Sequence, residues 1–222
     1  MKKIILTLTL ATVFMYNSMA GGGYEKAIGQ NIGSIFTTEN VADYDGVANK
    51  FVRIGEAEKD KWLPYYYASL TYIFKSFRLT TIEDKDQALI QAQQMLDKSA
   101  TLSESNSEIE ALQGFLYMMS LSVDPSNRGQ TMSPKAFGAY EKALALEPGN
   151  PRALLFKGQM MYGMAQFFGS GTEDACALVN KSMEIFEKEA GNQTIEPSWG
   201  IYSAKEYISK CNAPANEADE KE

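Results

Sequence analysis

The side chains that could carry chemistry in this 222-residue chain are two cysteines and scattered acids, and histidine is absent. Without histidine the chain lacks the usual general base, and with it the Ser-His-Asp and Cys-His arrangements that activate a nucleophile. Two thiols, Cys176 and Cys211, leave a metal badly short of ligands when no imidazole can join them. The sequence therefore predicts a non-enzymatic protein with no cofactor and no metal site.

The two cysteines leave two alternatives open. In an oxidising compartment, Cys176 and Cys211 have a single intramolecular pairing and would form a disulfide. Alternatively, both remain thiols inside the protein, because cysteine is commonly a small core residue.

Residues 1–20 have the pattern of a secretory signal peptide. Lys2 and Lys3 precede an apolar run from Ile4 to Met15, and Ser18 and Ala20 are small residues at the positions that a signal peptidase inspects. The apolar run is shorter than the ~20 residues that a bilayer requires, so we expect no stable membrane insertion. The pattern predicts cleavage after Ala20 and a periplasmic or secreted mature protein.

The mature chain is acidic. Removal of residues 1–20 takes away two lysines and no acidic residue, so the formal net charge changes from -7 to -9. Such a surface repels phosphate backbones and anionic lipid, which predicts no nucleic-acid partner. Residues 212–222 contain no large apolar side chain, and we expect them to form an acidic disordered tail.

The rest of the chain is predicted to be all-α. Apolar residues recur at intervals of three and four, and turn-forming Pro, Gly and Asn residues separate the periodic segments. The expected helices span about 24–36, 41–58, 62–78, 85–101, 107–122, 133–146, 151–167, 172–189 and 199–211.

One stretch, residues 136–153, has a recognisable spacing. Small, aromatic, small and proline residues stand at offsets 0, 4, 7 and 12: Ala136, Tyr140, Ala143 and Pro148. This resembles the second helix of a tetratricopeptide repeat (TPR), in which small residues let helices approach and proline stops the helix. The same phase returns at three further places: Ala92, Leu96 and Ser99; Ala175, Val179 and Ser182; and, in a first-helix frame, Tyr65, Ala68, Ser69 and Tyr72.

The resemblance covers about residues 62–189. It implies a superhelix of antiparallel helix pairs within one domain, residues 21–211, with a divergent first pair and a C-terminal capping helix. Longer turns around 122–131 and 167–171 would account for spacings above the usual repeat length. The layout, with a glycine-rich turn followed by Pro197-Ser198-Trp199-Gly200 and a last helix, is similar to small secreted or periplasmic repeat proteins of Bacteroidetes-type bacteria.

TPR proteins bind their ligands mostly through first-helix residues that line the concave face. Carried over to this chain, the resemblance implies an apolar groove with a single cation, formed by Tyr66, Leu70, Ile73, Phe74, Phe115, Met118, Met119, Arg152, Leu155 and Tyr162. Two alternatives follow. Either residues 21–40 or the terminal helix fill the groove and make it core, or the groove stays open for a ligand.

Two functions are compatible with these residues. The leading expectation is a non-enzymatic periplasmic or secreted scaffold that binds a protein or peptide partner. The alternative is a carrier that holds a small apolar ligand in the concave groove, where paired methionines would provide an adaptable surface.

The signal peptide gives a direct prediction. Protein recovered from the periplasm or the medium should have the intact mass of a chain that starts at Gly21, because Ala20 provides the small residue before the cleaved bond. A recovered chain that retains residues 1–20 would contradict the prediction.

Overall fold

The structure is a computed structural model that describes residues 8–192 and 194–213, with side chains from residue 22 onward. These residues form nine α-helices and no strand: α1 (Leu8–Thr37), α2 (Val41–Ala57), α3 (Leu63–Arg78), α4 (Ile82–Leu102), α5 (Ser107–Val123), α6 (Pro125–Leu146), α7 (Pro151–Phe168), α8 (Glu173–Glu189) and α9 (Ile201–Asn212). The all-α prediction is confirmed. The predicted tail lies outside the described residues from 214 on, and no side chain of the predicted signal peptide is described.

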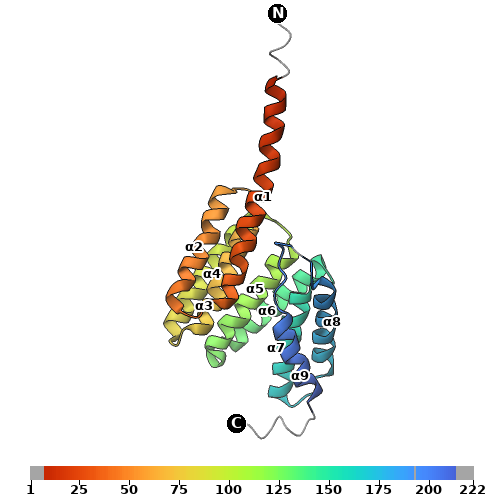
Figure 1. The fold of residues 1–222 in the computed structure, drawn as a ribbon. Helices are drawn as coiled ribbons and strands as arrows, with labels where there is room; N and C mark the ends of the chain where they lie inside the picture. Colours follow the sequence, from red (N-terminus) through yellow and green to blue (C-terminus); the bar gives the residue numbers. More distant parts are fainter. Residues whose placement is uncertain (1–7, 193, 214–222) are drawn as a thin grey trace, which may run out of the picture.

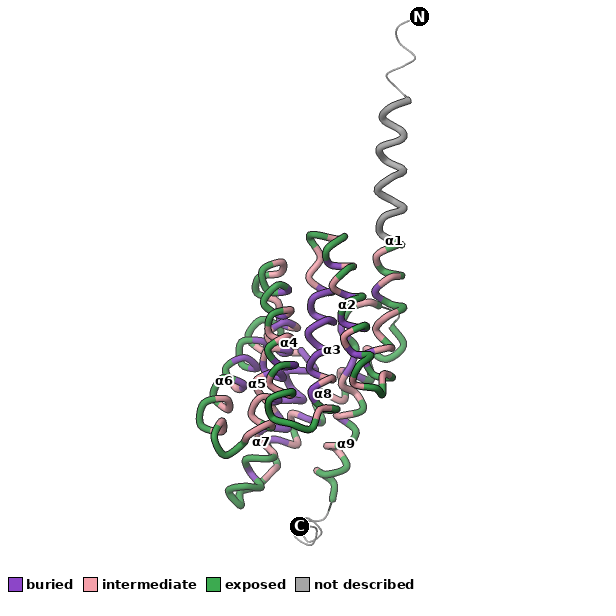
Figure 2. The backbone as a smooth tube through the Cα atoms, turned by 90° about the vertical axis from the view of Figure 1, so that its left-hand side faces the viewer, coloured by how far each residue is buried: buried purple, intermediate pink, exposed green. Residues whose placement is uncertain are grey.

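The helices stack as antiparallel pairs in chain order (Figure 1). The first helices of the pairs, α1, α3, α5 and α7, contact one another in series and form one face of the stack. At the end of the array, α9 packs on α8. The third helix is buried along most of its length, as the purple tube in Figure 2 shows. Across the described residues, no helix is long and apolar enough to cross a bilayer.

Local sequence signals set the helix ends. Asn106 accepts hydrogen bonds from the backbone N–H groups of Glu108 and Ile109 at the start of α5, and Asn150 accepts one from Ala153 in α7. These side chains satisfy donors that have no partner inside the helix. Proline occupies the first turn of α3, α6 and α7, where its missing N–H costs nothing. These capping residues and prolines therefore set the residue at which each of these helices begins.

Helix α6 is longer than the sequence indicated. It was expected at 133–146 after a long turn, and that expectation is wrong because α6 begins at Pro125. Pro125 stands at the first helical position, and the Asp124 carboxylate accepts from the N–H of Asn127 at 3.3 Å. What resembles a breaker is thus a helix start.

Small residues allow the helices of a pair to approach closely. Ala136, Ala143 and Tyr140 are each fully buried, and Gly114 lies directly against the Tyr140 ring. A β-carbon on Gly158 would lie 2.9 Å from the carbonyl oxygen of Ala175 in the facing helix α8. The spacing of small and large residues in the sequence therefore reflects how helices α5 to α8 pack against one another.

Gly158→Ala should destabilise the protein by about 1–3 kcal/mol, because the new methyl group meets backbone that cannot rotate away. The matched control is Gly138→Ala in α6, where nothing lies within 4 Å of the added β-carbon. That exposed helical site should gain up to about 1 kcal/mol from the same change. Urea unfolding of both variants checks the pair, and equal shifts would contradict this account of the packing.

Candidate functional site

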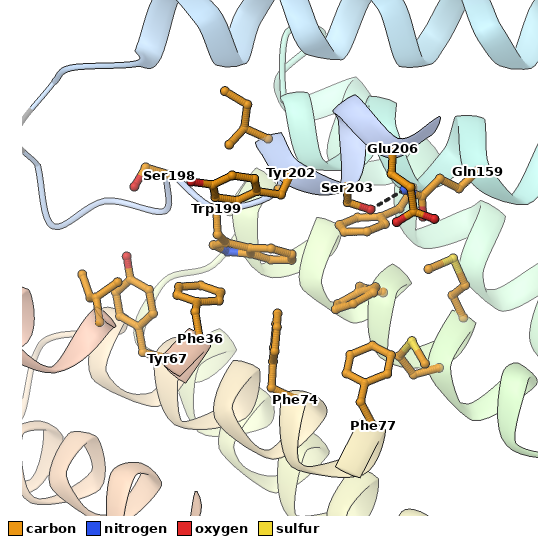
Figure 3. Close-up of a pocket in the computed structure, with 17 residues that line it drawn as sticks. Phe36, Tyr67, Phe74, Phe77, Gln159, Ser198, Trp199, Tyr202, Ser203 and Glu206 are labelled. Atoms are coloured by element: carbon orange, nitrogen blue, oxygen red, sulfur yellow. Dashed lines mark hydrogen bonds between the residues drawn. The ribbon is translucent and has the colours of Figure 1, made fainter. Parts of the chain in front are cut away.

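A pocket of about 660 Å³ opens on the face formed by the first helices of the pairs. The segment that precedes α9, together with the first half of α9, covers one side of it (Figure 3). The lining side chains come from five parts of the fold: Ile32 and Phe36 of α1; Tyr67, Phe74 and Phe77 of α3; Phe115, Met118 and Met119 of α5; Phe156 and Gln159 of α7; and residues 198–203 and 206. The chain folds back on its own concave face and leaves a hollow there.

Aromatic side chains make up eight of the seventeen residues that line the pocket. The rings of Phe115 and Phe156 stack with centroids 4.3 Å apart and planes 19° apart. The indole of Trp199 lies against both, at 5.5 Å and 5.6 Å between centroids. Phe36 meets Phe74 edge to face at 5.2 Å. Such a wall offers flat faces and ring edges, which suit another flat apolar molecule.

Polar groups are few in the lining. The amide of Gln159 donates to the hydroxyl of Ser203 at 2.8 Å and so links α7 to α9 (dashed line in Figure 3). Glu206 is the one Asp, Glu, Lys or Arg among the lining residues that the structure describes. Chemically, the pocket supplies apolar contact area with hydrogen bonds at one end. Throughout the described residues, no group of three His, Cys, Asp or Glu side chains could hold a metal ion.

An ion pair between a buried arginine and a largely buried glutamate lies beside the pocket. The guanidinium of Arg152 in α7 donates to both carboxylate oxygens of Glu108 in α5, at 2.6 Å and 2.7 Å. It also donates to the carbonyl oxygen of Trp199 at 3.2 Å. Burial alone would lower the pKa of Arg152, but the Glu108 carboxylate outweighs it and raises that pKa above its usual value. Arg152 therefore stays protonated inside the protein, and the Glu108 carboxylate balances its charge.

The same network holds the indole that walls the pocket. The Trp199 N–H donates to the hydroxyl of Tyr66 at 2.9 Å, and that hydroxyl lies 3.4 Å from the Glu108 carboxylate to which it donates. Burial, with the nearby carboxylate, raises the pKa of Tyr66 well above its ordinary value, so the phenol keeps its proton. Trp199 is thus fixed by hydrogen bonds to α3 and α7.

The structure separates the predicted groove residues into three groups. Phe74, Phe115, Met118 and Met119 line the pocket. Beneath them, Tyr66, Leu70, Ile73 and Leu155 are fully buried, and Arg152 is 3% exposed within its ion pair. Tyr162 lies outside the lining, where its ring meets Tyr207 of α9 edge to face at 5.9 Å. The concave face is therefore part core and part pocket.

Several lining residues were not anticipated from the sequence. Phe77 follows Phe74 by one helical turn, so its helical phase could have identified it. Helical phase could not identify Phe36, Trp199 and Tyr202 as lining residues, because their positions depend on how α1 and the segment around α9 fold onto the stack.

Cys176 of α8 and Cys211 of α9 form a disulfide in the structure, with their Cα atoms 5.7 Å apart. Neither cysteine lines the pocket. The bond connects the far end of α9 to the last helix pair.

Replacing Arg152 by methionine should destabilise the protein by up to about 3–5 kcal/mol, because the Glu108 carboxylate, only 14% exposed, would lose its cation. Adding Glu108→Leu to that variant should recover much of the loss. Lys142→Met is the matched control. Lys142 of α6 forms an ion pair with Glu110, which lies in α5 like Glu108, but the Lys142 side chain is 62% exposed. This replacement should cost at most about 1 kcal/mol. Chemical unfolding measures all three, and a small effect of Arg152→Met would contradict the role of the pair.

No family model matches the chain, and no curated protein matches it. Among solved structures, the chain is similar to that of the HusA haemophore from Porphyromonas gingivalis. The two share 26% sequence identity with a TM-score of 0.74, over 88% of this chain and 96% of the haemophore chain. The similarity covers the helical stack and its all-α architecture, and the neighbouring structure is that of a carrier protein from a Bacteroidetes bacterium.

Proposed function

We propose that the protein is an exported carrier that holds haem, or a similarly flat and largely apolar macrocycle, in the pocket of its concave face. The aromatic wall built by Phe115, Phe156 and Trp199 is the observation that carries this proposal. The pocket volume of about 660 Å³ lies in the usual range for sites that enclose a small molecule. The likeness to a haemophore supports the same cargo.

The residues present suit binding through the ring rather than through the metal. Haem iron is usually held by His, Cys, Met or Tyr. The sequence has no histidine, and both cysteines are joined in the disulfide. Burial raises the pKa of Tyr67, and its hydroxyl donates to the Ile195 carbonyl oxygen at 2.7 Å, so it is a poor source of phenolate. Among the lining residues, Met118, Met119 and Tyr202 are the remaining side chains of the types that hold haem iron.

The charge of the pocket orients the cargo. Haem carries two carboxylates on one edge of an apolar ring. The described lining contains Glu206 but neither lysine nor arginine, and the chain as a whole is acidic. Carboxylates inside such a pocket would be buried without a cation, which costs several kcal/mol. The acidic edge therefore faces solvent at the mouth, and the apolar part of the ring enters.

A carrier fits the pocket better than a peptide-binding scaffold does. An extended peptide along the concave face would have to displace the segment from Ser198 to Glu206 that covers part of it. The helix pairs are, in our proposal, degenerate repeats of the TPR type, since the small residues of that phase are buried at the pair interfaces. We place the mature protein in the periplasm or the medium, as the signal pattern indicates.

Haemin should bind the mature protein with saturation, quench tryptophan fluorescence because Trp199 forms part of the wall, and shift the haemin absorbance band. Phe77→Ala should weaken binding about 3- to 10-fold, which corresponds to one lost aromatic contact of roughly 0.5–1.5 kcal/mol. Phe77 is 50% exposed, so its truncation should leave stability nearly unchanged.

The matched control is Phe167→Ala. Phe167 is 84% exposed near the end of α7, just as Phe77 stands near the end of α3, but it is not part of the lining. Its replacement should leave haemin affinity unchanged. Equal losses in the two variants would indicate non-specific adsorption to surface aromatics. The absence of saturable haemin binding would contradict the proposed function.

A further inference from the structure

Helix α9 forms one wall of the pocket although it is thinly packed. Its residues Ile201, Tyr202, Ser203 and Glu206 line the pocket. Ala204 is the single residue of α9 that is buried, and Tyr202 is 84% exposed. An element with so little buried apolar surface has a low local stability and opens more readily than the rest of the fold. Ile201, Tyr207 and Ile208 of α9 pack against the core but are only partly buried, so further bonds add to what holds α9 in place.

Two anchors hold the ends of this segment. Before α9, Trp199 is 9% exposed and is bound to Tyr66 and Arg152, both of which belong to the buried network. At the other end, Cys211 is bonded to Cys176 of α8. Between the anchors lie the Gln159–Ser203 hydrogen bond and an edge-to-face ring contact. The first anchor fixes only the start of α9, and the disulfide, together with the packing of Tyr207 and Ile208, fixes its end.

We propose that Cys176 and Cys211 are positioning residues for the pocket: their disulfide holds α9 closed over the cargo. The affinity for cargo then depends on a covalent bond that no part of the cargo touches. The identity of the cargo rests on the proposed function, whereas the closure of α9 does not. Neither cysteine is fully buried, which is consistent with access of a small reductant from solvent.

The chemistry of release is thiol–disulfide exchange. The thiolate of a dithiol attacks one sulfur of the Cys176–Cys211 bond and releases the other cysteine as a thiol. The second thiol of the reductant then attacks the mixed disulfide and releases the first cysteine. The protein bond gains two electrons and two protons and becomes two thiols, while the dithiol becomes a disulfide. In an oxidising compartment the bond persists and the pocket stays closed.

The test compares the oxidised mature protein with the same protein reduced by dithiothreitol. Hydrogen–deuterium exchange of the α9 amides reports closure, exchange of α3 and α5 amides reports the integrity of the stack, and haemin titration reports affinity. On reduction, α9 should exchange faster while α3 and α5 stay protected. If reduced α9 is docked about a tenth of the time, haemin affinity falls about 10-fold. Removal of the reductant and reoxidation should restore both values.

A Cys176→Ser, Cys211→Ser double variant is the matched control. It should bind haemin as weakly as the reduced protein and should not respond to dithiothreitol, which excludes an effect of the reductant on haemin itself. Circular dichroism checks that the helical content is kept.

Three results would overturn the proposal: unchanged exchange in α9 after reduction, faster exchange in α9 with unchanged haemin affinity, or loss of protection in α3 and α5 together with α9. The last result would make the bond a general stabiliser rather than a positioning element. Failure of the oxidised protein to bind haemin would count against the proposed function alone, and the α9 exchange data would then decide whether the disulfide closes the pocket.

Discussion

Arg152 and Glu108 form an ion pair inside the protein, and much of the site depends on its being complete. A buried guanidinium is tolerated only when a carboxylate and further acceptors surround it. Glu108 supplies the carboxylate from α5, and the Trp199 carbonyl supplies an acceptor from the segment before α9. The pair thus joins the last two helix pairs, through α5 and α7, to the C-terminal segment. Its geometry determines where the indole of Trp199 stands.

Residues between the helices and residues on the concave face differ in size and in role. Between helices, small residues such as Ala143 and Gly158 allow close approach, and the volume is filled by buried rings such as Tyr140. On the concave face, large rings point into a space that no neighbouring helix of the stack occupies. The folding of α1 and α9 onto this face buries its deeper part and leaves the shallower part as the pocket. Core and pocket are consequently continuous, which gives the pocket a rigid aromatic floor and one less rigid wall.

That combination of a rigid floor and one less rigid wall suits the carrier function proposed above. A rigid floor provides ring contacts without the entropic cost of ordering side chains when the cargo binds. A wall made by α9, which the disulfide ties to α8, can close over the cargo without rearrangement of the stack. The acidic chain and the near absence of charge in the described lining favour a cargo that presents an apolar face inward and its acids to solvent. The likeness to a haemophore agrees with this physical picture.

The sequence by itself determined the helical class, the phase of the pair interfaces and the lack of histidine chemistry, because each depends on residue type and on spacings within one or two helical turns. It also pointed to four residues that line the pocket: Phe74, Phe115, Met118 and Met119. It could not separate them from Tyr66 and Leu155, which share their helix faces but are covered. Only the tertiary structure decided which of these residues are covered. Trp199 covers Tyr66 and donates a hydrogen bond to it, although the two are 133 residues apart in the sequence. Local periodicity carries no information about contacts at that separation.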